Sequence, residues 1–400
     1  MKQTSSNFDI IIVGGGLAGL CNAIHLSKFG KSILLIEKNS YPKHKVCGEY
    51  ISNEVLPYLS SLDINPFNFG AVKIDNFQIS TTNNKTISAK LPLGGFGISR
   101  YKLDFVLARK AIENGVSILQ DSVINIGFKN EVFSVETREN EKFSSKIAIG
   151  AFGKRSLLDV KIDRDFIKKK SPYLGVKIHV KGDFKSDLVA LHNFKGGYCG
   201  VSKVENEAIN LCYITNFSSF KKYKNIDTFQ EKVVFKNAFL KEIFQNSTPL
   251  FDQPLSISQI SFETKKPVEN HILMSGDAAG MIHPLCGNGM SMAIQSAQMA
   301  SKLILQFLNE EILTRNALEK QYIRKWNKKF SLRLKAGHFI AFLFRKNKTA
   351  SVLLQIIKKL PFLLPIIIKF TVIINTITHF NFPLKSPFTI PNKPCSSKPS

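Results

Sequence analysis

The 400-residue sequence predicts an α/β fold that combines a parallel sheet with helices, a second and mixed β-sheet, and a helical C-terminal region. Three observations lead to this prediction. A strand, a glycine-rich loop, a helix and another strand follow one another within residues 8–37. Short apolar runs separated by turn residues fill residues 174–214, as is typical of a sheet. From residue 325 the pattern is helical, basic and aromatic.

Composition limits the classes of protein to consider. Hydrophobic residues make up 44% of the chain, enough for two domains that share a core, and the 21% of charged residues argues against wholesale disorder. No repeat with a period of about 20–50 residues is visible in the sequence. The six cysteines form no CxxC pair and have no zinc-finger spacing, so we expect reduced, mostly buried thiols and no metal site.

The chain is strongly basic, with 55 Lys and Arg against 30 Asp and Glu and a net charge of +25. Such a surplus is typical of proteins that bind nucleic acid, anionic lipid or an acidic substrate, and equally of a lysine-rich composition bias. No nucleic-acid motif accompanies the charge, so we expect no nucleic-acid partner. The first apolar stretch, Ile10–Val13, runs into a glycine loop rather than a cleavage site, which predicts a cytoplasmic chain without a signal peptide.

The first strand and loop form the clearest motif. Phe8–Val13 (FDIIIV) is a short apolar run typical of a buried parallel strand. The loop Gly14–Gly19 fits GxGxxG, and a helical pattern over Leu17–Phe29 follows it. Ser32–Ile36 is predicted to be the second strand and ends at Glu37, which completes a βαβ unit of the expected length.

Each residue type in this motif suits a dinucleotide. Gly14 permits a tight turn, Gly16 lets a pyrophosphate approach the backbone, and Gly19 lets helix and strand pack closely. The helix N-terminus offers unpaired N–H groups and a partial positive charge to the phosphates. Glu37 can accept hydrogen bonds from ribose hydroxyls and repels a 2′-phosphate, which argues against NADP here. The predicted contacts in this half of the site are Gly14, Gly16, Leu17, Ala18, Gly19, Glu37 and Lys38.

A second glycine-rich block lies far along the chain. A strand predicted over His271–Ser275 precedes it, and a helical pattern that begins near Met290 follows it. Asp277 can bind a polyol hydroxyl, and the helix can direct its positive end at a group that becomes negative, such as the N1–C2=O edge of a reduced flavin. The predicted contacts in this half are Gly276, Asp277, Pro284, Gly287, Asn288, Gly289 and Met290.

Together these blocks resemble the cofactor motifs of one flavoprotein superfamily. The first is similar to the ADP-binding fingerprint of FAD-dependent enzymes. Gly276-Asp277 with the PxxGxG that follows resembles the ribityl-binding motif of the superfamily that includes aromatic hydroxylases, squalene epoxidases and geranylgeranyl reductases. Arg100–Leu107 (RYKLDFVL) is similar to its RxxLDxxL helix, which implies that Arg100 lies by the cofactor. The alternative is a surface ion pair of Arg100 with Asp104 at helical spacing.

The resemblance covers residues 8–345 and implies FAD as the cofactor, with NAD(P)H or another electron donor as a co-substrate. It also implies a Rossmann-like FAD-binding domain, in which a parallel sheet carries a β-meander, and a mixed β-sheet substrate domain. The predicted division gives residues 1–75, 100–165 and 268–345 to the FAD-binding domain and residues 76–99 and 170–267 to the substrate domain. Residues 346–384 are predicted to form a basic apolar helical region, and residues 385–400 are expected to be a disordered tail.

Two segments bear on which member of the superfamily the chain resembles. Gly150–Ser156 (GAFGKRS) stands where hydroxylases carry a GADG-like element, and Phe152 replaces the acid, which argues against a hydroxylase-style use of NADPH. Lys45–Glu49 (KVCGE) resembles the KxCG segment of geranylgeranyl reductases, which passes close to the isoalloxazine ring. Cys47 is therefore a candidate to shape the pocket or to donate a weak S–H bond, and the alternative is a packed loop thiol.

On the substrate side, four short strands are predicted, over residues 174–180, 189–194, 198–204 and 209–214. In the superfamily the equivalent sheet covers the flavin and carries the substrate pocket. The chain has GYCGV where geranylgeranyl reductases have a GYxWxFP-like stretch, and without its Trp and Pro the resemblance assigns no substrate. Tyr198 and Cys199 are substrate-pocket candidates, with ordinary sheet core as the alternative. His44, His192 and His283 are isolated in the sequence and are expected to be structural.

The apolar stretch over residues 351–377 is interrupted by Lys and Pro, so it falls short of the roughly 20 apolar residues that a membrane-spanning helix needs. Two alternatives remain open: a helix that lies on the inner face of the membrane, and a helix that packs on the body of the protein.

These observations favour a flavin reductase or dehydrogenase that acts on a lipophilic substrate, isoprenoid or unsaturated lipid-like, by hydride transfer at flavin N5. One alternative is a monooxygenase of the aromatic hydroxylase type that uses a C4a-hydroperoxyflavin, with an aromatic substrate. A further alternative is a non-catalytic module that binds flavin or membrane.

Overall fold

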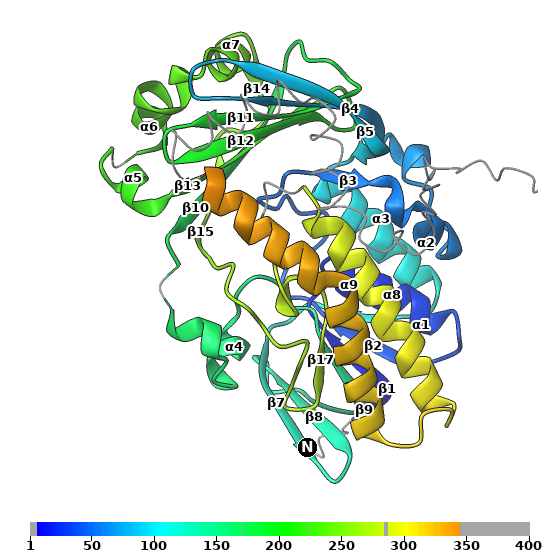
Figure 1. Cartoon of the computed structure of the whole chain (residues 1–400). Helices are drawn as coiled ribbons and strands as arrows, with labels where there is room; N and C mark the ends of the chain where they lie inside the picture. The colour runs from blue at the N-terminus through cyan, green and yellow to red at the C-terminus, as the bar shows by residue number, and fades with distance from the viewer. Residues whose placement is uncertain (1–5, 170, 224, 284–286, 345–400) are drawn as a thin grey trace, which may run out of the picture.

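A computed structural model describes residues 6–169, 171–223, 225–283 and 287–344. Figure 1 shows the second sheet with α6 (Ile226–Lys232) and α7 (Ala238–Gln245) above, and the first sheet with its helices below. The predictions for residues 346–384 and 385–400, and for Pro284, lie outside the described residues.

In the described part of the chain, the first sheet has eight strands. Its path runs through β16 (Val268–Glu269), β17 (Ile272–Met274), β9 (Lys142–Gly150), β1 (Ser6–Val13), β2 (Ile33–Ile36) and β6 (Ser117–Leu119). The strands from β17 to β6 are parallel, while β7 (Val123–Lys129), β8 (Val132–Thr137) and β9 form an antiparallel meander. This arrangement confirms the predicted parallel sheet with a β-meander.

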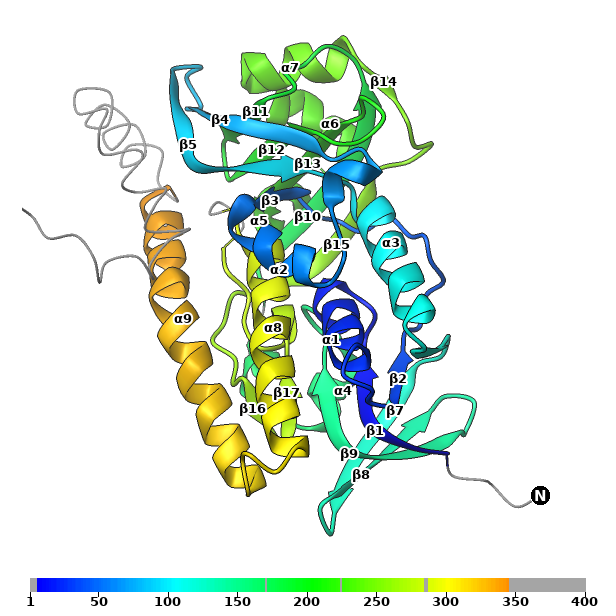
Figure 2. The same cartoon turned by 90° about the vertical axis from the view of Figure 1, so that its right-hand side faces the viewer.

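Both faces of this sheet are covered, which explains the continuous apolar run of β1. Ile10 and Ile12 pack against the helices α1 (Leu17–Ser27), α3 (Arg100–Glu113) and α8 (Gly289–Leu308), while Ile11 packs against the other side with Val135 and Leu158. Figure 2 shows the three helices side by side. The meander and α4 (Leu157–Lys161) cover the other face.

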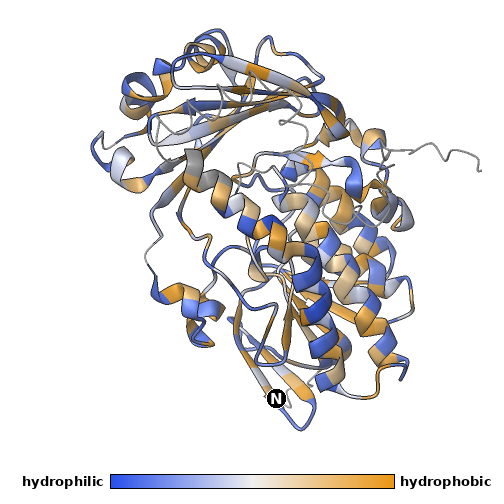
Figure 3. Cartoon of the chain, viewed as in Figure 1, coloured by the Kyte–Doolittle hydropathy of each residue, from blue (hydrophilic) through white to orange (hydrophobic). Residues whose placement is uncertain are grey.

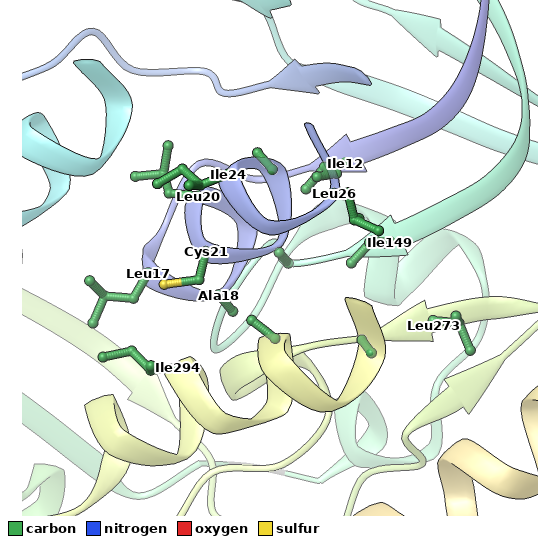
Figure 4. Packing of buried hydrophobic residues seen from close by; sticks show 14 of the residues in the cluster. Ile12, Leu17, Ala18, Leu20, Cys21, Ile24, Leu26, Ile149, Leu273 and Ile294 are labelled. Atoms are coloured by element: carbon green, nitrogen blue, oxygen red, sulfur yellow. The ribbon is translucent and has the colours of Figure 1, made fainter. Parts of the chain in front are cut away.

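Helix α1 is enclosed between the sheet and α8, and every residue from Leu17 to Leu26 is buried. Figure 4 shows its apolar side chains packed against the strand residues Ile12 and Ile149 and against Ile294 of α8. The amide of Asn22 donates to Ser275 Oγ at 3.2 Å, and Ser301 Oγ donates to Asn22 Oδ1 at 2.8 Å. These contacts hold the two glycine-rich blocks next to each other.

The second sheet has nine strands in the described part and is mixed. Its path runs through β14 (Thr248–Pro249), β10 (Tyr173–Lys181), β13 (Ile209–Asn216), β12 (Gly197–Lys203), β11 (Leu188–Phe194), β4 (Val72–Ser80), β5 (Thr86–Gly97) and β3 (Tyr50–Ser52), and β15 (Leu255–Ile260) also pairs with β10. Only the β11–β4 pairing is parallel among these. One face packs on α6 and α7 through a cluster that includes Phe229 and Leu240.

Two strands of the second sheet come from a region that the predicted division gives to the FAD-binding domain. They are β3, which pairs with β5, and the first residues of β4, which is one continuous strand from residue 72. Residues before position 75 thus contribute to both sheets. The division of the chain into domains stays a prediction.

Helix α9 (Arg315–Phe344) packs along α8 and ends beside the second sheet. Tyr322 donates from its hydroxyl to the carbonyl of Met274 at 2.6 Å, and the Arg333 guanidinium pairs with Glu54. Figure 3 shows hydrophilic residues along the lower, N-terminal half of α9, with hydrophobic residues among them towards its upper end. Among the described residues, none of the helices combines the length and apolarity required to cross a bilayer.

Candidate cofactor and substrate site

A cavity of about 1790 Å³ lies between the two sheets. Ligand pockets are usually about 300–1,000 Å³, so this cavity has room for more than one ligand. It brings together predicted residues from distant parts of the chain. Those that line it are Gly14, Gly16, Leu17, Ala18, Glu37, Lys38, Cys47, Arg100, Tyr198, Gly276, Asp277, Gly287, Asn288, Gly289 and Met290.

Two of the predicted glycines act through close packing. Gly14 has φ of +106°, and a Cβ placed there would lie 2.4 Å from the carbonyl oxygen of Ala151, which follows β9. Gly19 does not line the cavity. A Cβ on Gly19 would lie 2.0 Å from the carbonyl oxygen of Gly14, so its role is to let α1 approach the loop.

Two helix N-termini open onto the cavity. Helix α1 begins at Leu17 and α8 at Gly289, no side chain caps either helix, and neither first turn holds an acidic residue. The first N–H groups of a helix lack partners within the helix and carry a partial positive charge. The two ends therefore fit one ligand that has a pyrophosphate at one end and a ring that gains negative charge at the other.

The carboxylate of Glu37 is held in place at the end of β2. The backbone N–H of Gly15 donates to Oε2 at 2.7 Å, and Asn39 donates to Oε1 from its backbone at 3.1 Å and from its side chain at 2.7 Å. A carboxylate has about four acceptor positions, so one stays free for a ribose hydroxyl. Lys38 lines the cavity beside it.

Arg100 and Asp104 form the ion pair that their spacing predicts, but the pair is buried rather than on the surface. The guanidinium donates to both carboxylate oxygens at 2.8 Å, and Lys45 Nζ adds a third bond at 2.9 Å. Burial alone would raise the pKa of Asp104, but the charges of Arg100 and Lys45 outweigh it and hold the pKa below its ordinary value. Arg100 Nη2 lies 3.5 Å from where a Cβ on Gly16 would be, which places the guanidinium beside the loop Gly14–Gly19.

Cys47 is half-buried and lines the cavity in the segment between the two sheets. The side-chain amide of Asn210 donates to the carbonyls of Cys47 and Gly48 at 3.2 and 2.9 Å. Cys212 on β13 also lines the cavity, and sequence reasoning missed it. The alternation of inward and outward residues along β13 is the signal that could have found it.

The loop of the second block is supported by a buried lysine that sequence reasoning also missed. Lys265 is 5% exposed and donates at 2.8 Å to the backbone carbonyls of Asp277 and Lys154. Burial lowers its pKa to about 8. Asp277 lines the cavity, and Gly276 N donates to Ser296 Oγ of α8 at 2.8 Å, so the loop is fixed from both sides.

The two substrate-pocket candidates on β12 face opposite ways. Tyr198 lines the cavity, but Cys199 lies in the cluster under α6 and α7, so its assignment to the pocket is wrong. Successive side chains of a strand point to opposite faces, and both faces of this sheet are buried. Sheet core was the right alternative for Cys199.

Two of the predicted structural histidines, His192 and His44, lie in different parts of the structure. His192 is buried behind the sheet, where Nδ1 lies 2.9 Å from Ser80 Oγ and the ring stacks on Phe239. His44 lines the cavity against Tyr101 and Phe251. Burial lowers the pKa of both to about 4, so each is neutral at pH 7.

The cavity continues from its polar end to an apolar end under the second sheet. Its walls there come from β4, β5, β11 and α9, namely Phe77, Ile79, Leu91, Val189, Leu191, Leu332, Ala336 and Phe339. The polar end has two helix N-termini, and the residues listed for the apolar end carry no charge. The two ends therefore suit two different molecules, one polar and one apolar.

Comparison with known proteins agrees with this geometry. The model of the NAD(P)-binding Rossmann-like domain matches residues 12–43, and that of squalene epoxidase matches residues 240–356. The chain is 24% identical over 362 residues to conditioned medium factor receptor 1 of Dictyostelium discoideum, covering 81% of this chain and 68% of that protein. It is 23% identical over 340 residues to a digeranylgeranylglycerophospholipid reductase of Methanococcus vannielii, covering 82% of this chain and 84% of that protein.

Solved structures show the same fold. The flavin-dependent brominase Bmp2 superposes with a TM-score of 0.76 at 19% identity, covering 92% of this chain and 93% of its own. A geranylgeranyl bacteriochlorophyll reductase-like protein from Thermoplasma acidophilum superposes with a TM-score of 0.67 at 19% identity, covering 84% and 86%.

Proposed function

We propose that this FAD-dependent oxidoreductase, a member of the superfamily that includes geranylgeranyl reductases and flavin monooxygenases, saturates a carbon–carbon double bond of a lipophilic substrate. The observation that carries the proposal is the continuity of the cavity from its polar end to its apolar end. In this proposal the cavity would hold FAD, which would supply a hydride to the double bond; one proton would complete the saturation, and NAD(P)H or another donor would supply the two electrons beforehand.

The residues of this chain bind and orient the reactants in this proposal. The N-terminus of α1 and Arg100 hold the pyrophosphate, and Glu37 holds the ribose. The N-terminus of α8 would stabilise negative charge on the ring of FAD. Phe77, Ile79 and Leu191 exclude water from the reacting double bond and hold the chain of an isoprenoid or unsaturated lipid.

A monooxygenase on the same fold is the second candidate. The squalene epoxidase match and the brominase structure favour it. Against it stands Phe152, which lines the cavity where hydroxylases of the superfamily have an acid. The proposed reductase is therefore the function that the geometry supports best.

The test is an anaerobic turnover with photoreduced protein and polyprenyl or unsaturated glycerolipids. We expect the lipid product to gain the mass of two hydrogens for each double bond saturated, and one equivalent of flavin to be reoxidised for each double bond. Leu191→Trp is expected to lower kcat/KM about tenfold or more, because the indole fills the apolar end, with FAD affinity unchanged. The matched control is Leu188→Trp on the same strand, outside the cavity lining. Oxygen consumption with an oxygenated product would establish the monooxygenase instead.

We also propose that the protein contacts a membrane surface at the apolar end. Three apolar side chains of α9 are exposed there: Leu332 by 48%, Phe339 by 62% and Phe342 by 64%. Leu332 and Phe339 also line the cavity, and Lys335 lies exposed between them on the helix. Exposed aromatics beside lysines suit an anionic lipid surface, from which a lipid substrate can enter the cavity directly.

The double substitution Phe339→Ser/Phe342→Ser is expected to weaken co-sedimentation with anionic vesicles at least about tenfold, because two apolar side chains no longer enter the lipid. Leu313→Ser is the control, since Leu313 is 84% exposed but lies before α9 and away from the cavity. Equal binding of the double variant and the wild type would contradict membrane contact at this end.

A further inference from the structure

A buried group of titratable side chains lies beside the cavity, and none of it is needed to explain the polar or the apolar end. Glu49 and Lys177 have no exposed side-chain surface, and the side chain of His179 is 5% exposed. Lys177 Nζ donates to Glu49 Oε1, and His179 Nε2 lies 2.6 Å from Glu49 Oε2. Lys177 and His179 are alternate residues of β10 and so face the same side of the second sheet.

The carboxylate of Glu49 also reaches the first sheet's helices. The backbone N–H of Arg100, the first residue of α3, donates to Oε1 at 2.7 Å. Burial would raise the pKa of Glu49, but Lys177 and His179 more than offset it and hold the pKa below its ordinary value. An ionised Glu49 therefore joins its own segment, the N-terminus of α3 and the second sheet.

The segment Lys45–Glu49 is fixed at both ends and in the middle. Lys45 bonds to Asp104 at one end, Glu49 bonds to β10 and α3 at the other, and Asn210 holds the carbonyls between them. Glu49 has φ of +54°, a backbone conformation that residues with a β-carbon adopt rarely. Such a conformation persists where several contacts impose it, and it is frequent at functional sites.

The position of this segment relates it to the cofactor. Lys45, Cys47 and Glu49 all line the cavity. A Cβ on Gly287 would lie 3.4 Å from the ring of Tyr50, so the segment runs next to the loop before α8. The part of the cavity between them lies by the N-terminus of α8, where the ring end of the proposed FAD would lie.

We propose that Glu49 is a positioning residue that holds the segment with Cys47 against the ring end of FAD and fixes Arg100 at the pyrophosphate. Replacing a buried ion pair by apolar groups is often neutral for stability, so stability alone does not account for this cluster. The cluster instead holds the residues around the proposed cofactor in one fixed arrangement. The proposal rests on FAD binding in this cavity and is independent of which substrate is reduced.

The test compares two double substitutions that each remove one buried ion pair without changing the net charge. Glu49→Gln/Lys177→Met removes the proposed positioning pair. Glu54→Gln/Arg333→Met removes the pair that joins η1 (Asn53–Val55) to α9, whose side chains are 12% and 3% exposed and do not line the cavity. Three measurements are made on each protein: the FAD dissociation constant of the apoprotein, the flavin midpoint potential, and the alkylation rate of Cys47 in the apoprotein, resolved by peptide mass spectrometry.

We expect Glu49→Gln/Lys177→Met to weaken FAD binding about tenfold, to alkylate Cys47 several-fold faster and to shift the potential, while the control stays within about twofold of the wild type. Because the net charge is unchanged, a shifted potential reports the position of the segment rather than lost charge. Unchanged values in all three measurements would overturn the proposal. A wild-type protein that takes up no FAD would instead contradict the cofactor assignment itself.

A milder substitution covers the case in which the double variant does not fold. His179→Gln removes one contact to Oε2 and leaves Lys177 and Arg100 in place. A folded His179→Gln protein is expected to alkylate Cys47 about twofold to threefold faster and to shift the flavin potential in the same direction as the double variant. If both values equal those of the wild type, Glu49 does not position the segment.

Discussion

Replacing Gly14 with alanine is expected to raise the FAD dissociation constant at least about a hundredfold, equivalent to about 3 kcal/mol. The new Cβ would lie 2.4 Å from the carbonyl oxygen and 2.6 Å from the carbonyl carbon of Ala151. Both are backbone atoms of the residue that follows β9, so β1 and β9 must separate next to the loop that is proposed to bind the pyrophosphate. A φ of +106° adds strain of roughly 1–3 kcal/mol for a residue with a β-carbon.

The control for Gly14→Ala is Gly30→Ala, just after α1. Gly30 also has a positive φ, of +71°, but a Cβ there would meet no atom within 4 Å. We expect Gly30→Ala to destabilise folding by about 1 kcal/mol and to leave the FAD dissociation constant unchanged. Titration of both apoproteins with FAD, followed by fluorescence quenching, measures the difference. Wild-type affinity in Gly14→Ala would show that the cofactor does not use this loop.

Stability is expected to rise with pH because of Lys265. Its pKa is about 8 in the folded protein and about 10.5 when unfolded, so between these values the unfolded chain binds more protons. The folded state is therefore penalised below pH 8, on the order of 3 kcal/mol, and the penalty disappears as pH rises towards 10.5. Between pH 7 and 9.5 the free energy of unfolding should gain about 2 kcal/mol from this group.

Lys265→Met should remove that gain, since methionine carries no proton to lose. Chemical unfolding of the wild type and the variant at several pH values gives the difference, in which the ionisation of other groups cancels. Lys266→Met is the matched control, because the neighbouring lysine is exposed by 66% and pairs only with Glu269 in the described part of the chain. A difference between wild type and Lys265→Met that does not change with pH would show that Lys265 stays protonated in the fold.

The sequence predicts which residues line the polar end of the cavity well, because the signals for them are local. Strand β1, the loop Gly14–Gly19 and helix α1 follow one another without interruption, and each element has a strong residue pattern of its own. Arg100 and Asp104 are one helical turn apart, so their pairing is also a local prediction. Their burial is not local, since it depends on Lys45 and on the second sheet.

Features that depend on distant contacts were missed or assigned wrongly. Tyr198 and Cys199 are adjacent in an apolar stretch, and both faces of β12 are buried. The hydrophobicity of the sequence therefore does not tell which of the two side chains faces the cavity. Glu49 meets Lys177 and His179 more than a hundred residues away. A lysine and a histidine at alternate positions of an apolar strand were the available signal, since buried charges need partners.

The cavity is assembled from parts of the chain that are made at very different times. Asn22 of α1 and Ser275 after β17 are 253 residues apart and bond to each other beside the site. A growing chain that ends before residue 270 has the loop Gly14–Gly19 but lacks β17, which borders β9, and α8, whose N-terminus opens onto the cavity. Contacts of such long range form late in folding. Because FAD stabilises only a state that binds it, chains that end before residue 270 are expected to gain less of its binding energy than the whole chain.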